Sequence, residues 1–219
     1  MEKEERSEER GELFILSAPS GTGKNTLIRE VLAIFGESGG LVYSVSYTTR
    51  PPREGEIYGQ NYYFIDQSEF DRMITNEEFL ESAEYNSHRY GTAASEVLPR
   101  LDAGLDVIIE IEVRGTELLM QRCPKAHAIF LLPPSYRDLK GRIEKRGIDG
   151  PVDVTNRLTL AQWEIGRYGL YQYAIINDDL ECASQALAAI ILEKRQRLAR
   201  QEGRIEKVLE DFGRFASDP

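Results

Sequence analysis

A short apolar run, a Gly-rich turn and a helix follow one another near the start of this chain, and no other feature constrains the fold as much. Residues 13–16 read Leu-Phe-Ile-Leu, residues 17–26 read Ser-Ala-Pro-Ser-Gly-Thr-Gly-Lys-Asn-Thr, and a helical stretch comes next. This order wraps a phosphate, because backbone N–H groups and the helix N-terminus point at the anion. We expect positive φ angles at Gly21 and Gly23. An ordinary turn is the alternative, but Lys24 directly after Gly-x-Gly favours the phosphate loop.

Short apolar runs alternate with longer amphipathic segments through most of the remaining chain. Runs of this length between helices are typical of βαβ units. They predict an α/β fold with a mostly parallel sheet that helices cover on both faces. The further runs lie at 41–45, 105–111, 128–132 and 173–176, and the helical segments lie near 115–122, 136–146, 153–167 and 180–200.

Charge and composition exclude several classes of protein. Lys and Arg number 27 against 37 Asp and Glu, a net charge of -10 that repels nucleic acid and anionic membranes. An anionic ligand therefore needs a local cluster of basic side chains. No apolar run approaches the roughly 18 residues of a membrane span, and the first ten residues lack the apolar core of a secretory signal. With cysteine only at 123 and 182, we expect a reduced, cytoplasmic protein.

The phosphate loop departs from the pattern G-x-x-x-x-G-K-[ST] at both ends. Ala18 replaces the first glycine, and Asn25 stands where a hydroxyl would bind Mg²⁺. An amide oxygen is a hard ligand that magnesium accepts, but the amide nitrogen could crowd the ion. We expect Asn25 to weaken binding of the magnesium nucleotide, or to slow turnover, without abolishing the fold.

A second cluster of basic and phenolic groups follows the second apolar run. Arg50 and Arg53 bracket a stiff Pro-Pro, and guanidinium forks bind phosphate through paired hydrogen bonds. Tyr62 and Tyr90 could donate to the same phosphate. Tyrosines at strand spacing usually fill a core, but neighbouring Gly and Arg residues favour a binding role here.

Glu81 follows an apolar pair, where a lone glutamate usually marks a solvated face. A carboxylate also matches guanine, whose N1–H and N2–H₂ donors lie side by side, whereas adenine presents no such pair. A buried acceptor left unpaired by the wrong base discriminates strongly between bases.

Seven segments, in order and at similar spacing, resemble the guanylate kinase family from about Gly11 to Lys194. The resemblance implies a parallel-sheet phosphate-loop kinase core with an inserted GMP-binding region and a lid. It implies transfer of the γ-phosphoryl of ATP to GMP, giving ADP and GDP in purine nucleotide metabolism, with Mg²⁺ as cofactor. The segments are SAPSGTGKNTL, SVSYTTRPPREGE, YGQNYYF, FLESAEYNSHRYGT, EIEVRG, LPPSYRDLKGRIEKRG and IINDDL.

The resemblance also implies roles for individual residues. Arg114 departs from it, because the family generally has Gln there. The implied ATP-binding residues are Ala18, Pro19, Ser20, Gly21, Thr22, Gly23, Lys24, Asn25, Thr26 and Asn177, of which Asn177 would touch adenine. The implied GMP-binding residues are Ser46, Arg50, Arg53, Tyr62, Glu81, Tyr90, Gly91, Thr92, Glu110 and Glu112. The implied catalytic residues are Lys24, Arg50, Arg142, Arg146 and Arg157, and the implied metal ligands are Asn25 and Glu112.

We expect the chain to divide into a core, an insertion and a lid. The core would comprise residues 11–45, 94–136 and 158–195, the GMP-binding insertion 46–93, and the lid 137–157 with a mobile loop at 147–153. A disordered tail at 1–10 would precede the core and a helical extension at 196–219 would follow it. The insertion and lid would swing inward over both nucleotides and exclude water.

Two interpretations stay open. Guanylate-kinase-like domains also occur as binding modules without catalysis, and Asn25 keeps this alternative in view; a kinase for another nucleoside monophosphate is opposed by Glu81. The seven-residue spacing of Ile191, Leu198, Ile205 and Phe212 could form a coiled-coil seam, although Gly203 and polar neighbours favour a plain surface helix. The protein would be a monomer or a homodimer that binds only small molecules.

Overall fold

A five-stranded parallel sheet forms the centre of the protein, in a computed structural model that describes residues 10–36, 39–85, 87–145 and 151–215. The strand order is β2-β7-β1-β8-β9, and every neighbouring pair runs parallel. The strands are β1 (Leu13–Ser17), β2 (Leu41–Tyr43), β7 (Asp106–Glu110), β8 (His127–Leu132) and β9 (Tyr173–Ile176). The α/β class predicted from the apolar runs is confirmed, although β2 ends two residues before its run does.

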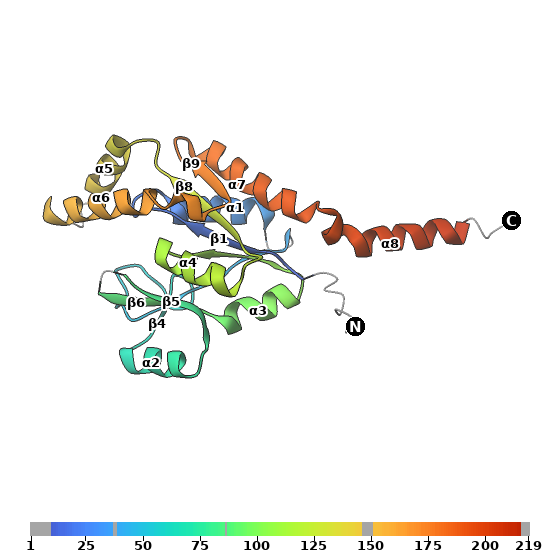
Figure 1. Ribbon diagram of the computed structural model, residues 1–219, viewed down its shortest axis with the longest axis horizontal. Helices are drawn as coiled ribbons and strands as arrows, with labels where there is room; N and C mark the ends of the chain where they lie inside the picture. Colours follow the sequence, from blue (N-terminus) through green and yellow to red (C-terminus); the bar gives the residue numbers. More distant parts are fainter. Residues whose placement is uncertain (1–9, 37–38, 86, 146–150, 216–219) are drawn as a thin grey trace.

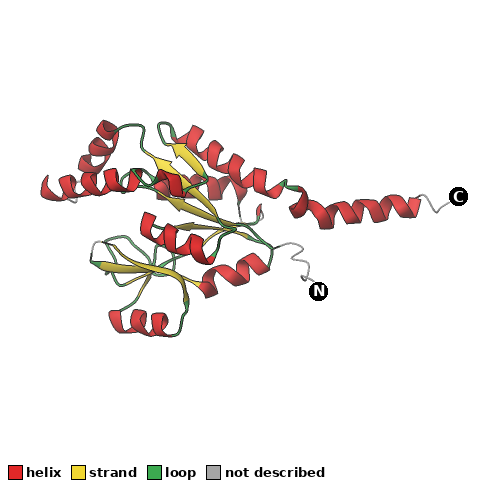
Figure 2. Cartoon of the chain, viewed as in Figure 1, coloured by secondary structure: helices red, strands yellow, loops and turns green. Residues whose placement is uncertain are grey.

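Helices cover both faces of this sheet (Figures 1 and 2). Phe14 and Leu16 of β1 pack with residues of α1 (Lys24–Phe35) and α7 (Leu180–Arg195), whereas Leu13 and Ile15 pack with α3 (Ala94–Asp102) and α4 (Val113–Arg122). Successive side chains of a strand point to opposite faces, so each face has its own apolar core. Burial on both sides explains why the strands are short continuous apolar runs.

The segment between β2 and α3 forms a second sheet with a core of its own. Its strand order is β4-β3-β6-β5, and Phe70, Met73, Phe79 and Ala93 pack as a separate apolar cluster. Figure 1 shows this sheet below the main one, beside α4. Its elements are β3 (Tyr47–Thr48), β4 (Tyr63–Phe64), α2 (Gln67–Thr75), β5 (Phe79–Tyr85) and β6 (His88–Ala93).

Two helices after β8 pack as a pair, α5 (Tyr136–Lys145) and α6 (Pro151–Ile165), followed by the short η2 (Tyr168–Leu170). Leu139 and Ile143 of α5 contact Leu158 and Ala161 of α6. Pro151 opens α6, where its missing N–H has no cost. Residues 146–150, most of the expected lid loop, lie outside the described residues, and the lid boundary expected at 157 falls inside α6.

The helical segment expected near 180–200 ends earlier, because α7 stops at Arg195 and the chain begins again as α8 (Leu198–Phe215). Arg195 and Arg200 both reach Asp106 at the start of β7, at 2.6 Å and 3.2 Å. Figure 1 shows α8 extending away from the body. Within the described residues, no helix combines the length and apolar character that a membrane span requires.

Candidate functional site

The phosphate loop joins β1 to α1 at the carboxyl end of the main sheet. Gly21 and Gly23 have φ angles of 93° and 102°, which confirms the positive values expected from the sequence. Thr22 closes the turn, since its N–H and its hydroxyl both donate to the carbonyl of Pro19 at 3.2 Å and 2.8 Å. The loop therefore holds its shape through its own hydrogen bonds.

Lys24 is buried at the first position of α1 and faces carboxylates. Its ammonium donates to the carbonyl of Ala18 at 2.8 Å and lies 3.3 Å from Glu112 and 3.8 Å from Glu110. Burial alone would lower the pKa of Lys24, but Glu112, Glu110 and Glu164 outweigh burial and hold that pKa above its usual value. The lysine is therefore a charged donor at any working pH.

Asn25 turns its amide toward the same carboxylates. In the orientation that satisfies both groups, its nitrogen donates to the two carboxylate oxygens of Glu110 at 2.8 Å and 3.0 Å. The side chain expected to offer an oxygen to Mg²⁺ is thus engaged through its nitrogen.

Two carboxyl groups face each other on the acidic side of this site. No other donor in the described part of the chain reaches the buried Oε2 atoms of Glu112 and Glu164. Burial and the charge of Glu112 raise the pKa of Glu164 to about 8, so Glu164 is protonated at neutral pH and can donate to Glu112. Among the described residues, no three acidic, His or Cys side chains are grouped as a complete metal site. Magnesium usually takes only one or two protein carboxylates and completes its shell with water and phosphate oxygens, so the carboxylate of Glu112, 3.3 Å from Lys24 at the phosphate loop, fits it.

Arg50 is fixed by a carboxylate that the sequence argument did not single out. Its guanidinium donates to Glu56 and to the carbonyl of Pro51, both at 2.8 Å, and only 8% of the residue is exposed. The other carboxylate oxygen of Glu56 accepts the backbone N–H of Arg53 at 2.8 Å. Arg53 thus joins this pairing through its backbone, while its side chain is exposed.

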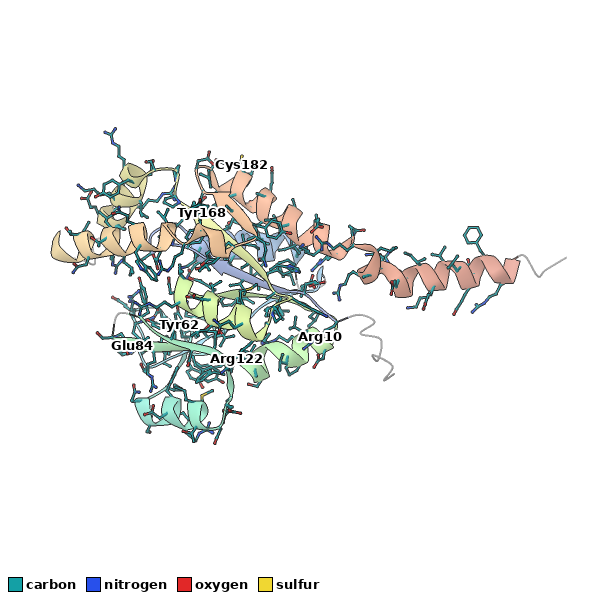
Figure 3. The ribbon with its side chains drawn as sticks, in the orientation of Figure 1. Arg10, Tyr62, Glu84, Arg122, Tyr168 and Cys182 are labelled. Carbon is teal, nitrogen blue, oxygen red and sulfur yellow. The ribbon has the colours of Figure 1, made fainter. Side chains whose placement is uncertain are left out.

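Tyr62 and Tyr90 lie beside Arg50, as their expected role requires. The guanidinium of Arg50 is 5.4 Å from the ring centre of Tyr62, and the two phenol rings are 5.8 Å apart. Burial raises the pKa of Tyr62, and the nearby charge of Glu110 adds to the effect. Figure 3 shows Tyr62 in the inserted region. Tyr62 therefore lies beside Arg50 and within the electrostatic influence of Glu110 on the main sheet.

Glu81 is buried on β5 and paired across the inserted sheet with Thr92 on β6. The hydroxyl of Thr92 donates to Glu81 at 2.8 Å, and 5% of Glu81 is exposed. Burial raises the pKa of Glu81 to about 7, although the bonds from Thr92 oppose the shift. Ser46, just before β3, is also buried at 5%. The solvated-face alternative for Glu81 is wrong.

Arg142 on α5 contacts the phosphate loop. Its guanidinium donates to the carbonyl of Thr22 at 3.2 Å and to that of Asn177 at 2.9 Å. The amide of Asn177 donates to the same Thr22 carbonyl at 2.7 Å. Asn177 thus braces the loop, and its expected contact with adenine stays a prediction.

The structure describes only one of the other two arginines expected in the lid, Arg146 and Arg157. Arg146 lies outside the described residues. Arg157 on α6 is half-buried, and its charge acts on the phenol of Tyr85 in β5. A cavity of about 470 Å³ between α5 and α6 is lined by none of the expected site residues and belongs to another surface.

Arg114, the departure from the family pattern, stacks near Trp163. Its guanidinium is 5.5 Å from the Trp163 ring, and that of Arg167 is 3.9 Å from it. This contact joins α4 to α6 and gives Trp163 a packing role.

Sequence reasoning missed Glu56 and Glu164. The signal for Glu56 was available, because it lies six residues after Arg50 in a loop that Pro-Pro bends back. Glu164 gave no signal, since its burial at 2% exposed results from how α6 packs on the site. Burial and the charge of Glu112 hold the pKa of Glu164 well above its usual range.

Comparisons with known proteins agree on one family. A family model described as guanylate kinase matches residues 10–194. A guanylate kinase of Thermus thermophilus is 43% identical over 91% of this chain and 89% of its own length, and one of Neisseria meningitidis serogroup A is 43% identical over 92% and 97%. The crystal structure of guanylate kinase from Anaplasma phagocytophilum matches with a TM-score of 0.72 and 30% identity, covering 88% of this chain and 90% of that one.

Proposed function

The chain belongs to the guanylate kinase family, and from this premise we propose how its residues divide the work of the reaction. That reaction is the transfer of the γ-phosphoryl group of ATP to GMP, which gives ADP and GDP. The phosphate loop with Lys24 and Arg142 is our candidate for the ATP phosphates. The inserted sheet, with Arg50 and Glu81, is our candidate for GMP.

GMP is recognised at both of its ends. Glu81 accepts the two adjacent donors of guanine, and Thr92 orients the carboxylate through its hydroxyl. At the other end, the fork of Arg50 and the phenols of Tyr62 and Tyr90 hold the phosphate. Ser46, Arg53 and Gly91 belong to the same proposed surface, and Glu110 and Glu112 face it from the main sheet.

Phosphoryl transfer to GMP requires no base, because the attacking phosphate oxygen is already anionic. The protein must instead bring two polyanions together and align them. Lys24 and Arg142 supply fixed positive charge where the transferred group spreads its own. We assign Arg50, Arg146 and Arg157 to the same task.

Mg²⁺, when bound with ATP, neutralises phosphate charge and orients the oxygens. Glu112 is the protein ligand best supported, since its carboxylate lies beside the phosphate loop, 3.3 Å from the ammonium of Lys24. Asn25 is the second candidate. Its amide must release Glu110 or offer its oxygen alone, so we propose that it weakens the magnesium site.

The wider assignments follow the same reasoning. We propose that residues 46–93 and 137–157 move as GMP-binding and lid segments relative to the core. Both cysteines are free thiols, which supports a reducing, cytoplasmic setting. The net charge of -10 repels other polyanions, so we propose ATP and GMP as ligands and neither nucleic acid nor membranes as partners.

The buried pair of Glu81 and Thr92, on the sheet that carries Arg50, is the observation that carries the GMP assignment. A coupled assay of ADP release with GMP, dGMP, AMP and UMP tests it. We expect turnover with the guanine nucleotides at least 100-fold above that with AMP or UMP, since a buried carboxylate rejects a base without two adjacent donors.

Asn25→Ser, measured beside the original chain, tests the magnesium assignment. We expect the variant to saturate at lower Mg²⁺ concentration. An unchanged Mg²⁺ dependence removes Asn25 as a ligand. If the original chain binds GMP but releases no ADP, that result would favour the non-catalytic binding module instead.

A further inference from the structure

Helix α8 presents an apolar stripe that the body of the protein does not cover. Figure 1 shows the helix extending beyond the main sheet, on the side away from α5 and α6. The stripe consists of Leu198 (72% exposed), Ile205 (39%), Val208 (54%), Leu209 (65%) and Phe212 (73%). Side chains three, four and seven residues apart share one face of a helix, so these five form a continuous surface.

This stripe differs from the seam weighed in the sequence. That seam began at Ile191, which is fully buried in the main core on α7. The chain breaks between α7 and α8, so Ile191 and the α8 residues are not on one helix. The stripe described here lies on α8 alone, is centred between Ile205 and Val208, and is exposed to solvent at each of its five residues.

Charge on α8 argues against an anionic lipid surface as its cover. Four basic residues (Arg200, Arg204, Lys207 and Arg214) are balanced by four acidic ones (Glu202, Glu206, Glu210 and Asp211). A helix that binds anionic membranes carries an excess of Lys and Arg on its polar face. Here the two signs are balanced.

The charges along one edge of the stripe are complementary to the same edge of a second copy of α8 that runs antiparallel. Arg204 and Asp211 lie one heptad apart on the same edge, just outside the apolar residues. When two copies of α8 pair antiparallel about a twofold axis, each edge meets the same edge of the partner in reverse order. Arg204 then faces the partner's Asp211, and the pair occurs twice. In the parallel arrangement this edge meets the opposite edge, and Asp211 has no basic residue opposite it.

The same antiparallel register also fills the apolar layers. Ile205 packs on the partner's Val208, and Phe212 packs on the partner's Gln201, whose methylene stem covers part of the ring. Arg204 now donates to Gln201 of its own helix at 3.3 Å, an exposed contact that a carboxylate of the partner can replace. The helix is about 27 Å long, so the paired segment is short and the association is weak.

We propose that α8 joins two copies of this chain into an antiparallel homodimer through this stripe. The phosphate loop lies at the carboxyl ends of the strands, whereas α8 is anchored through Arg200 at Asp106, the start of β7. Each copy therefore keeps its own site, and pairing leaves the reaction unchanged.

Sedimentation equilibrium of the full chain tests the proposal between about 5 and 500 µM. We expect the average mass to rise with concentration from 24.9 kDa toward twice that value. Phe212→Lys removes the rise, because it places a charge in the seam at a position that the fold leaves exposed. Lys207→Glu, on the opposite face of α8, is the matched control and leaves the rise intact.

Charge reversal then identifies the pairing direction. Arg204→Asp and Asp211→Arg each oppose like charges at two symmetric positions, so each raises the dissociation constant roughly 5- to 30-fold. The double reversal restores the original value. Kinetics with ATP and GMP stay the same in all variants.

Three results would overturn the proposal. One is a constant monomer mass over the whole range. Another is self-association that Phe212→Lys leaves unchanged, which places the interface elsewhere. The third is binding of α8 to phosphatidylcholine vesicles, lost in Phe212→Lys, by a chain that remains monomeric.

Discussion

At the residue scale, the role proposed for Glu81 predicts that GMP binding depends on pH. Burial raises the pKa of this carboxyl to about 7, so at neutral pH about half of the free protein carries a protonated Glu81 that cannot accept both guanine donors. We expect kcat/KM for GMP to fall about tenfold per pH unit below 7. Bound guanine stabilises the carboxylate, so kcat bends at a lower pH than kcat/KM.

Glu81→Gln separates this effect from the titration of GMP itself. The GMP phosphate also titrates, with a pKa near 6, and its bend remains in the variant while the bend from Glu81 disappears. Loss of two charge-assisted hydrogen bonds lowers kcat/KM by roughly 10²- to 10⁴-fold. A variant with the same pH profile as the original chain would show that Glu81 does not contact the base.

Glu56 holds the guanidinium of Arg50 and the backbone of Arg53, so we expect it to act on GMP through Arg50. In Glu56→Gln one of these two donors meets an amide nitrogen and loses its partner. We expect KM for GMP to rise about 10- to 100-fold, since a hydrogen bond to a charged group contributes about 1.5–3 kcal/mol. KM for ATP should stay constant, which a general loss of structure would not allow.

Glu54→Gln is the matched control for this prediction, because Glu54 is exposed in the same loop. Its KM for GMP should not change. A lower KM in Glu56→Gln would mean that the carboxylate competes with the GMP phosphate for Arg50, which contradicts the positioning role.

At the element scale, Gly91 sets how closely β5 and β6 pack. A Cβ at Gly91 would lie 2.8 Å from the ring of Phe79, in the core of the inserted sheet. We expect Gly91→Ala to lower the free energy of unfolding by about 1–3 kcal/mol through overpacking. Gly141→Ala in α5 meets no atom within 4 Å and should raise it by about 1 kcal/mol, because Ala favours the helix.

Urea denaturation of both variants measures the two effects. Equal changes in the free energy of unfolding of the two variants would contradict the packing argument, since a Cβ is crowded at Gly91 and not at Gly141.

The elements show how far the sequence reaches. The apolar runs of β1, β7, β8 and β9 were predicted, because strands buried on both faces need continuous apolar residues. The pairing within the inserted sheet was not, since β3 and β4 have only two residues each and carry no pattern. The ion pairs of Arg195 and Arg200 with Asp106, on either side of the break between α7 and α8, join residues that are distant in the chain, so no local pattern predicts them.

The site follows the same rule. The loop around Gly21, Gly23 and Lys24 could be predicted, because adjacent residues fix its shape. The turn of the Asn25 amide toward Glu110 depends on a strand some 85 residues away, so only the structure shows it.

At the scale of the whole molecule, we propose that closure brings the inserted sheet and the lid over the two nucleotides. The chain carries a net charge of -10, so its overall field repels the anionic ATP and GMP, and the basic groups of the site must offset that repulsion locally. In the structure Arg142 rests on the carbonyls of Thr22 and Asn177, whereas Arg50 is held by Glu56. We propose that Arg142 exchanges these neutral carbonyls for phosphate oxygens when both nucleotides are present, while Arg50 keeps its bond to Glu56.

Small-angle scattering of the Phe212→Lys variant measures this closure without the contribution of paired α8 helices. We expect the radius of gyration to fall most with a non-hydrolysable ATP analogue plus GMP, and less with either one alone. The analogue plus AMP is the control, because adenine lacks the paired donors that Glu81 accepts, so the inserted sheet stays open. A radius that is the same with the analogue plus GMP as without ligand would mean that the site is already assembled, and that the cationic side chains do not converge by movement of the two segments.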